Sequence, residues 1–226
     1  MEKLNIQIDD ERNTTIAFVT LTDGERDFAF NRHDTADFNI DFGDIDFSGY
    51  EDLHIVHLGS LMLSEQKGRE LAEKVANKAS ELGAIFSFDM NFRKDIYNDF
   101  EDAKRAYEPF VERADIIKFS DDELAEYTGI SDMDKAAESV LKKDKLLLVT
   151  LGKSGSAYYY NGLKGIVPSI SGVKCVDTTG AGDAFFGAFL ANTEGKELTE
   201  EKVVYAMQQG NIKGAKAMEF YGAIEL

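Results

Sequence analysis

The feature that most constrains the fold is an alternation of short apolar segments with amphipathic ones, which begins after Glu51. The segments DLHIVHL, AIFSFD, DIIKFS and KLLLVTLG have the length and apolar content of buried strands. Between them, segments such as GRELAEKVANKASELG and AKRAYEPFVERA repeat apolar residues with the period of a helix. Strands that alternate with helices form sheets covered by helices, so we predict an α/β layered domain with a mostly parallel sheet.

Two further segments predict β-hairpins. In TTIAFVTLTDGERDFAFNR, residues 14–32, the pair Asp23-Gly24 separates two runs that alternate apolar and polar residues. The segment SAYYYNGLKGIV predicts a second hairpin after the last buried strand, and two closing helices are expected after it. We therefore divide the chain into a partial small β lid with a connecting loop, residues 1–50, and an α/β core, residues 51–226.

Composition excludes several classes of protein. The 226 residues are 43% hydrophobic, which suffices for one sizeable core, and the formal net charge of −17 repels nucleic acid and anionic membranes. We expect neither as a partner, since the chain also lacks an apolar run of about 20 residues that would span a bilayer. Cys175 is the only cysteine and is predicted to be a small core residue. We expect a cytoplasmic location.

The segment VDTTGAGDAFFGAFLAN, residues 176–192, predicts an anion site with an adjacent base. A glycine-rich turn that runs into a helix is expected to leave the N–H groups of Gly180, Ala181 and Gly182 unpaired at the positive end of the helix. Asp183 falls in the first turn, where it could accept the proton of a hydroxyl that attacks a phosphoryl group. The alternative is an ordinary capped helix with Thr178 or Thr179 as the N-cap.

The string VDTTGAGDAF resembles the signature of the ribokinase-like family of carbohydrate kinases, also called the phosphofructokinase B family. The resemblance extends over FAFNRHDTAD, HLGSLMLSE, FSFDMNFR, ADIIKFSDDEL, VTLGKSGSAYY and the closing YGAI. It implies a three-layer sandwich and the ATP-dependent phosphorylation of a small carbohydrate at a hydroxyl, with fructose as the first expectation and 2-keto-3-deoxygluconate as the alternative. It also implies that Asp183 is the catalytic base and that residues 180–182 receive the transferring phosphoryl group.

The resemblance assigns the remaining candidate residues, and each has a structural alternative. It places Thr150, Gly152, Gly155, Thr179 and Asn211 at the nucleotide, and Arg32, Asn91 and Arg93 with Asp183 at the substrate. It implies ATP and Mg²⁺ as cofactors, with Glu123 holding the magnesium through water, and leaves a monovalent cation open. Alternatively, Gly152 and Gly155 serve a β-turn, Asn211 is an internal hydrogen bonder, and Ser120 with Glu123 forms a capping box.

Some landmarks of the family are missing from the sequence. The family has an N-terminal segment with a first core strand, a Gly-Gly and Asn sugar motif and an Asp that binds sugar hydroxyls, and we find none of them in this chain. A catalytically silent fragment that binds nucleotide is therefore a further alternative. The hairpin of residues 14–32 lacks its sheet partners, so we expect it either to pair with another chain, which would make a homo-oligomer through the β lid, or to remain mobile.

Overall fold

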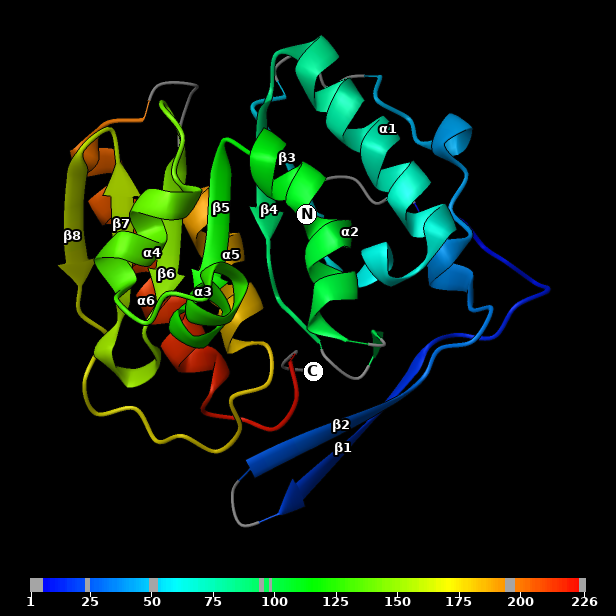
Figure 1. Ribbon diagram of the computed structural model, residues 1–226. Coiled ribbons are helices and arrows are strands. Elements are labelled where there is room, and N and C mark those ends of the chain that lie inside the picture. The colour runs from blue at the N-terminus through cyan, green and yellow to red at the C-terminus, as the bar shows by residue number, and fades with distance from the viewer. Residues whose placement is uncertain are drawn as a thin grey trace. The chain divides into compact units, whose positions relative to one another are not determined.

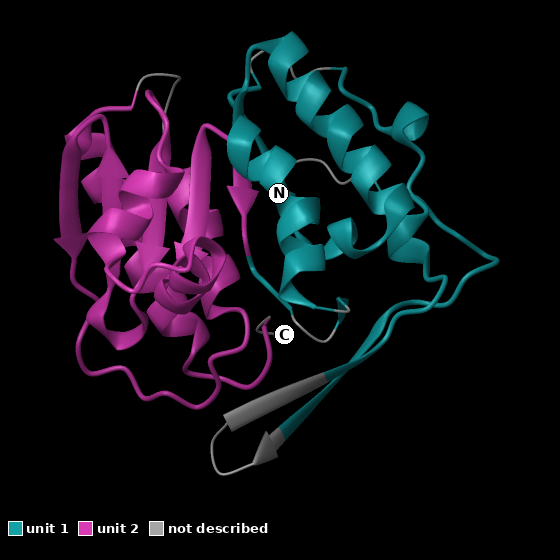
Figure 2. Ribbon diagram, in the orientation of Figure 1, with its two compact units in different colours: residues 1–86, 91–113 teal, residues 87–90, 114–226 magenta. Residues whose placement is uncertain are grey.

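The computed structural model describes residues 6–22, 25–48, 53–93, 96–97, 99–193 and 198–223. The chain forms two compact units, which Figure 2 distinguishes by colour. The first unit consists of residues 1–86 and 91–113, and the second of residues 87–90 and 114–226. The predicted division into a lid of residues 1–50 and a core of residues 51–226 stays a prediction.

The first unit contains the predicted N-terminal hairpin, whose strands are β1 (Ile16–Thr22) and β2 (Glu25–Asn31). They pair antiparallel, with Ile16 opposite Asn31, so the predicted β-ribbon is confirmed (Figure 1). Its predicted turn, Asp23-Gly24, lies outside the described residues. The other elements of this unit are η1 (Ala36–Phe38), η2 (Phe42–Asp44), β3 (Ile55–Gly59), η3 (Leu61–Ser64), α1 (Gln66–Leu82) and α2 (Phe100–Arg113).

The second unit is built on a sheet whose helices follow the predicted alternation. Its strands are β4 (Ile85–Asp89, of which the first two residues belong to the first unit), β5 (Ile116–Ser120), β6 (Leu146–Thr150), β7 (Ser156–Tyr160) and β8 (Leu163–Val167). Its helices are α3 (Asp121–Thr128), α4 (Met133–Val140), η5 (Gly152–Ser154), α5 (Ala181–Ala191) and α6 (Glu200–Ala217). The strand order is β3-β4-β5-β6-β7-β8 (Figure 1), so the strands predicted from apolar runs share one sheet.

The pairing of the strands explains where a ligand can bind in the second unit. Strands β4, β5 and β6 are parallel, whereas β6, β7 and β8 form an antiparallel meander that contains the second predicted hairpin. The parallel strands are almost wholly buried, as expected for a sheet with helices on its faces. Their carboxyl ends, at Asp89, Ser120 and Thr150, meet at one edge, where open α/β sheets bind ligands.

Helices α5 and α6 pack at backbone distance. A Cβ atom added at Gly210 of α6 would lie 2.8 Å from the ring of Phe185, and one added at Gly214 would lie 2.9 Å from the carbonyl oxygen of Ala181. Side chains at these two positions would push the helices apart. The two glycines of α6 therefore allow the first turn of α5 to rest directly on its neighbour.

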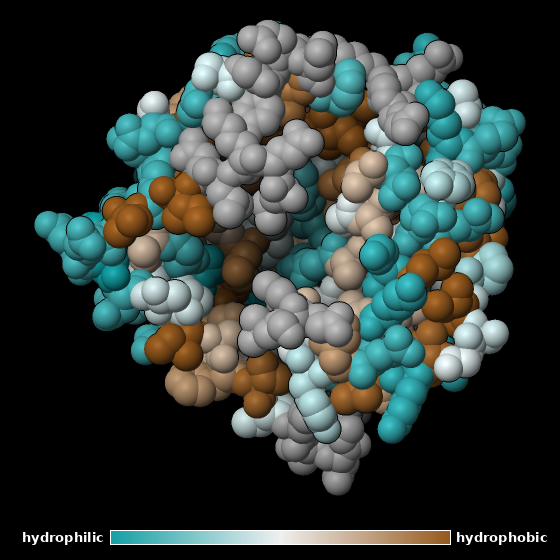
Figure 3. All heavy atoms as spheres, turned by 180° about the vertical axis from the view of Figure 1, so that it is seen from behind, coloured by the Kyte–Doolittle hydropathy of each residue, from teal (hydrophilic) through white to brown (hydrophobic). Residues whose placement is uncertain are grey.

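The surface combines hydrophilic and hydrophobic residues, as the view from behind in Figure 3 illustrates. Ile16, Phe18 and Val19 of β1 are 49%, 56% and 45% exposed. Among the described residues, no helix has both the length and the apolar character needed to cross a membrane.

Candidate active site

Helix α5 begins without a side-chain cap. Its N-cap residue is Gly180, which has a φ of 77° in the left-handed region, and no side chain accepts a hydrogen bond there among the described residues. The predicted alternative, with Thr178 or Thr179 as the N-cap, is therefore wrong, because the left-handed glycine moves the helix start past both threonines. The positive end of α5 carries no internal acceptor from a side chain and can take an anion.

One detail of the predicted anion site needs correction. The N–H of Ala181 donates to the carbonyl oxygen of Thr178 at 3.2 Å, so it is not unpaired. The sequence could not reveal this bond, since it forms only when Gly180 takes the left-handed conformation. The anion-binding donors of the turn are therefore to be sought at Gly180 and Gly182 instead of Ala181.

The turn before α5 is held by Asp177. Its Oδ1 accepts the N–H and the Oγ1 hydroxyl of Thr179 at 3.0 and 2.7 Å, and its Oδ2 accepts the N–H of Gly222 at 3.0 Å. The N–H of Val176 donates to the carbonyl oxygen of Met218 at 2.7 Å. These bonds tie the turn to the segment after α6, so its position is fixed before any ligand arrives. A nucleotide contact of Thr179 stays a prediction.

Asp183 is exposed in the first turn of α5, and its charge acts on the carboxyl of Asp89. Burial raises the pKa of Asp89 above its ordinary value, the ammonium of Lys118 partly opposes this, and the charges of Glu123 and Asp183 raise it further. Lys118, Glu123 and Asp183 therefore lie within electrostatic reach of Asp89, at the carboxyl end of β4. The site combines an accessible carboxylate, a helix N-terminus and a buried ion pair.

The predicted capping box at the start of α3 is confirmed. The Oγ of Ser120 accepts the N–H of Glu123 at 3.2 Å, and Oε2 of Glu123 accepts the N–H of Ser120 at 2.8 Å. No group of three metal-ligating side chains occurs among the described residues. Mg²⁺ fits this arrangement only as an ion held mainly by water and nucleotide phosphates, with one or two carboxylates near it. The role of Glu123 toward magnesium stays a prediction.

A cavity of about 440 Å³ adjoins the turn. Its lining includes six of the predicted residues, which come from three separate stretches of the sequence: Thr150, Gly152, Gly155, Ala181, Gly182 and Asn211. Cys175 also lines it and is exposed, so the prediction of a core cysteine is wrong. The cysteine lies in the loop before the turn, where no strand or helix forms around it.

Gly155 and Asn211, beside this cavity, have the structural roles that were the alternatives to nucleotide binding. Gly155 has a φ of 112°, and a Cβ there would lie 2.2 Å from the carbonyl oxygen of Val167, so only glycine fits. The Oδ1 of Asn211 accepts the hydroxyl of Ser156 at 3.1 Å, and its Nδ2 donates to the carbonyl oxygens of Val167 and Pro168 at 2.9 and 3.2 Å. Asn211 is thus confirmed as an internal hydrogen bonder; its contact with a nucleotide stays a prediction.

The three predicted substrate residues other than Asp183 belong to the first unit. The guanidinium of Arg32 binds Oδ2 of Asp37 through Nε and Nη2 at 3.1 and 2.6 Å, and its Nη1 donates to the carbonyl oxygen of Leu61 at 2.7 Å. Its side chain is 5% exposed and lies 4.0 Å from the ring centre of Phe38. Arg32 therefore fastens the end of the hairpin, a role that the sequence did not suggest.

Asn91 and Arg93 follow β4. Asn91 has a φ of 32°, a strained conformation for a residue with a side chain, and its carbonyl oxygen accepts the hydroxyl of Ser60 at 3.3 Å. Arg93 donates to the carbonyl oxygen of Phe92 at 3.2 Å. Roles of Arg32, Asn91 and Arg93 toward a substrate stay predictions.

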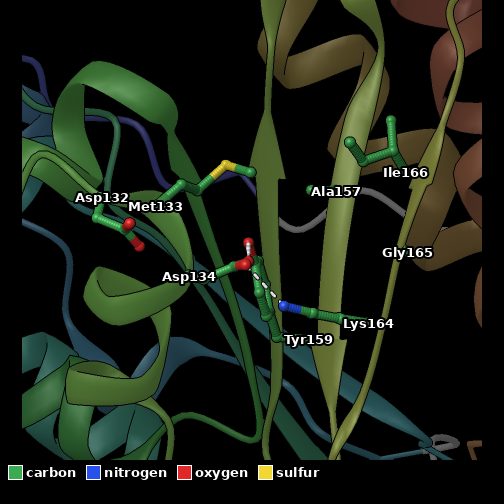
Figure 4. A pocket seen from close by; sticks show the side chains of 8 residues that line it. All are labelled: Asp132, Met133, Asp134, Ala157, Tyr159, Lys164, Gly165 and Ile166. Carbon is green, nitrogen blue, oxygen red and sulfur yellow. Dashed lines mark hydrogen bonds and ion pairs between the residues drawn. The ribbon is translucent and has the colours of Figure 1, made fainter.

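A second cavity of about 460 Å³, between α4 and the β7–β8 hairpin, contains none of the predicted residues. In Figure 4, Tyr159 and Lys164 converge on Asp134. The carboxylate of Asp134 accepts the hydroxyl of Tyr159 at 2.8 Å and the ammonium of Lys164 at 2.6 Å. Its polar groups satisfy one another, so the cavity beside α5 is the better candidate.

Comparison with known proteins identifies the family of this chain. A family model described as pfkB family carbohydrate kinase matches residues 3–225. The chain belongs to this family. Fructokinase-1 of Oryza sativa subsp. japonica is 36% identical over 213 residues, which cover 90% of this chain and 66% of that relative. This chain spans 57% to 69% of the length of the first curated relatives.

Solved structures of fructokinases share the fold of this pfkB family member. The fructokinase of Vibrio cholerae O395 with fructose, ADP and calcium ion bound has a TM-score of 0.82 at 28% identity, over 95% of this chain and 70% of that chain. The fructokinase of Xylella fastidiosa with bound ATP has a TM-score of 0.85 at 27% identity, over 95% of this chain and 70% of that one. The predicted ribokinase-like α/β fold is confirmed.

The ion pair of Lys118 with Asp89 was not predicted from the sequence. The Nζ atom of Lys118 lies 2.8 and 3.0 Å from the two carboxylate oxygens of Asp89, and both side chains are buried. A lysine inside the apolar run DIIKFS was the signal that could have found it, because a buried lysine needs a partner. The partner itself depends on the strand register, in which Asp89 lies opposite Lys118.

Proposed function

We propose that this pfkB family member transfers the γ-phosphoryl group of ATP to a hydroxyl of a small carbohydrate, with fructose as the substrate. The observation that carries the proposal is the uncapped start of α5, with Gly180 in the left-handed conformation and Asp183 exposed in the first turn. The fructokinase relatives, and the fructose, ADP and ATP held by the fructokinase structures named above, support the choice of substrates.

The chemistry follows from the position of Asp183. Its carboxylate takes the proton of the attacking hydroxyl as the oxygen of that hydroxyl forms a bond to the γ-phosphorus. The bond from the γ-phosphorus to the oxygen that bridges it to the β-phosphorus breaks, and ADP leaves with that electron pair. Charge that develops on the transferring group is stabilised by the N–H groups of Gly180 and Gly182 and by the helix dipole.

The cavity beside α5 suits the rest of the nucleotide. Its lining is largely apolar around Phe185, Ala215 and Met218, and Thr150 and Lys153 contribute polar groups. Mg²⁺ would supply charge neutralisation of the phosphates when it is bound with ATP, and Glu123 is the residue that we expect to hold it through water. The cytoplasm is the proposed location, on the basis of the single cysteine.

An assay of ADP release with a panel of sugars tests the proposal. We expect turnover with fructose, and mass spectrometry should show one added phosphoryl group on the sugar. Turnover with 2-keto-3-deoxygluconate and not with fructose would contradict fructose as the substrate but would support the proposed phosphoryl transfer. Binding of an ATP analogue without turnover of any sugar would favour the silent nucleotide-binding alternative and contradict the proposed activity.

We also propose that the hairpin of β1 and β2 joins two copies of the chain. The support is the exposure of Ile16, Phe18 and Val19, apolar side chains that a partner strand or sheet would cover. Light scattering should give the mass of a dimer, and Phe18→Lys should shift the mass to that of a monomer. A parent chain that is monomeric at high concentration would contradict the proposal.

A further inference from the structure

The ion pair of Lys118 with Asp89 occupies an unusual place for two charged side chains. Lys118 is 5% exposed and Asp89 is 3% exposed, and they face each other across the parallel strands β5 and β4. The free energy lost when two charges are removed from water is about as large as the free energy gained from their attraction. A buried ion pair is therefore seldom a net source of stability.

The pair lies directly against the turn that begins α5. A Cβ atom added at Gly182 would be 3.5 Å from Nζ of Lys118 and 3.8 Å from its Cε atom. Gly182 is the second residue of the helix and has no side chain to separate the ammonium from the turn. An ammonium has three N–H donors, and the two described bonds of Lys118 both go to Asp89.

The local charge balance indicates what the ammonium does. Asp89 has the carboxylates of Glu123 and Asp183 within electrostatic reach, and a phosphoryl group would add further negative charge. A fixed cation in a water-poor site stabilises such charge more than a mobile cation in solvent. Without Lys118, the three carboxylates would oppose the binding of an anion at the turn.

We propose that Lys118, oriented by Asp89, supplies a fixed positive charge behind the first turn of α5 that favours the transferring phosphoryl group. The inference rests on the proposed kinase function. Asp89 is the positioning residue. Lys118 stabilises the negative charge of the γ-phosphoryl group while the γ-phosphorus exchanges its bond to the bridging oxygen of ATP for a bond to the oxygen of the sugar hydroxyl. Neither residue exchanges a proton in this step.

The test removes both charges at once, with Lys118→Met/Asp89→Asn. Because no uncompensated charge remains buried, we expect this double variant to melt close to the parent. We expect kcat to fall about 100-fold, the size of effect typical of losing one preorganised electrostatic group. The affinity for a non-hydrolysable ATP analogue should fall at least about tenfold, whereas the affinity for AMP, which lacks the γ-phosphoryl group, should change less than about twofold.

The matched control is Lys164→Met/Asp134→Asn, which makes the same chemical changes at the exposed ion pair of Figure 4. It should leave kcat and both affinities unchanged. A folded Lys118→Met/Asp89→Asn variant with the kcat and the analogue-to-AMP affinity ratio of the parent would overturn the inference and leave the kinase function standing. A parent chain that binds neither nucleotide would overturn both.

If the double variant does not fold, Gly182→Ala provides the test. It places a methyl group in ordinary contact with Nζ of Lys118 and leaves the ion pair intact. We expect it to lower the affinity for the ATP analogue more than the affinity for AMP. An unchanged ratio of the two affinities would overturn the inference.

Discussion

Helices α3 and α5 both belong to the second unit, and their first turns are built in opposite ways. The start of α3 is closed by its own side chains, since Ser120 and Glu123 form a reciprocal capping box. The start of α5 has Gly180 at the N-cap and no side-chain cap among the described residues. Each helix also has at least one acidic residue in its first turn, so acidity alone does not distinguish them.

The difference teaches that a helix start becomes a candidate site when its donors are left without internal partners. A capped start gains stability from its own side chains, typically about 1 kcal/mol. An uncapped start gives up that stabilisation, and an anion from outside can take the place of the cap. We therefore expect loss of the cap of α3 to alter stability and loss of the Asp183 carboxylate at α5 to alter activity.

The largest effect is expected from Asp183→Asn. The change keeps the size of the side chain but removes the base, so kcat should fall about 10² to 10⁴-fold, or roughly 3 to 5 kcal/mol of barrier. Loss of its helix-dipole interaction alone would alter stability by only about 0.3 to 1 kcal/mol. Steady-state kinetics and thermal melts on the same variant measure the two quantities.

Asp122→Asn is the control for Asp183→Asn, because it removes an exposed carboxylate from the first turn of α3. It should leave kcat near the parent value. An Asp183→Asn variant with near-normal turnover and a lowered melting point would make Asp183 a structural residue and end the distinction between the two helices.

The next effect is a loss of stability in Gly180→Ala. The residue has a positive φ, and the new Cβ would lie 2.8 Å from the Cβ of Ala223, so strain and overpacking add to about 2 to 4 kcal/mol. Gly129→Ala, at the other end of α3, has a similar φ of 71° but open space around its Cβ, and should cost only about 1 kcal/mol. Urea denaturation measures the free energy of unfolding of both variants. Equal losses of stability would show that Ala223 can move away from the new Cβ atom at little cost.

A smaller effect is expected from Ser120→Ala. The variant loses the capping bond to the N–H of Glu123, which should cost about 1 kcal/mol and lower the melting temperature by about 2 to 4 °C. Thr179→Ala is the counterpart at α5, where the hydroxyl binds Asp177 and caps no helix. Calorimetry should show a smaller decrease of the melting temperature for Thr179→Ala than for Ser120→Ala. A larger decrease would show that the bond of Thr179 to Asp177 contributes more to stability than the capping bond of Ser120.

The smallest effect concerns the start of α6, where Thr199 accepts the N–H of Lys202 at 3.4 Å. A hydrogen bond from its own backbone, and then one from Thr199, lower the pKa of Glu201 below its ordinary value of 4.5. A lowered pKa adds stability that is present above pH 4.5 and is lost as the pH falls through the folded-state pKa. Unfolding free energies at pH 6 and pH 3 should therefore differ less in Glu201→Gln than in the parent, and an equal difference would contradict this.

Periodicity and turn residues predicted most of the fold. The hairpins, the parallel strands and the helices appear where local patterns place them, because each pattern reports which face of a segment must be buried. The candidate site was predicted at Asp183 and at the glycines of the turn for a similar reason: a glycine-rich turn before an apolar helix is a local signal.

The errors and omissions concern interactions that local patterns do not encode. Neither Thr178 nor Thr179 caps α5, because Gly180 takes the left-handed conformation and is itself the N-cap. The φ angle of a glycine cannot be predicted from the sequence. Cys175 is exposed because no element forms around its loop, whatever its own hydrophobicity. The pairing of Asp89 with Lys118 depends on the register of two strands separated by a whole helix.

The close packing of Gly210 and Gly214 against α5 has a consequence for engineering. A side chain at Gly214 would press on the carbonyl oxygen of Ala181, and one at Gly210 on the ring of Phe185, so either change would displace the turn of α5 that carries Asp183, the proposed base. Directed evolution toward other sugars should therefore tolerate broad libraries on exposed loops of this chain but almost none on the inner face of α6. The inner face of α6 carries no proposed catalytic group, yet it should tolerate the fewest substitutions.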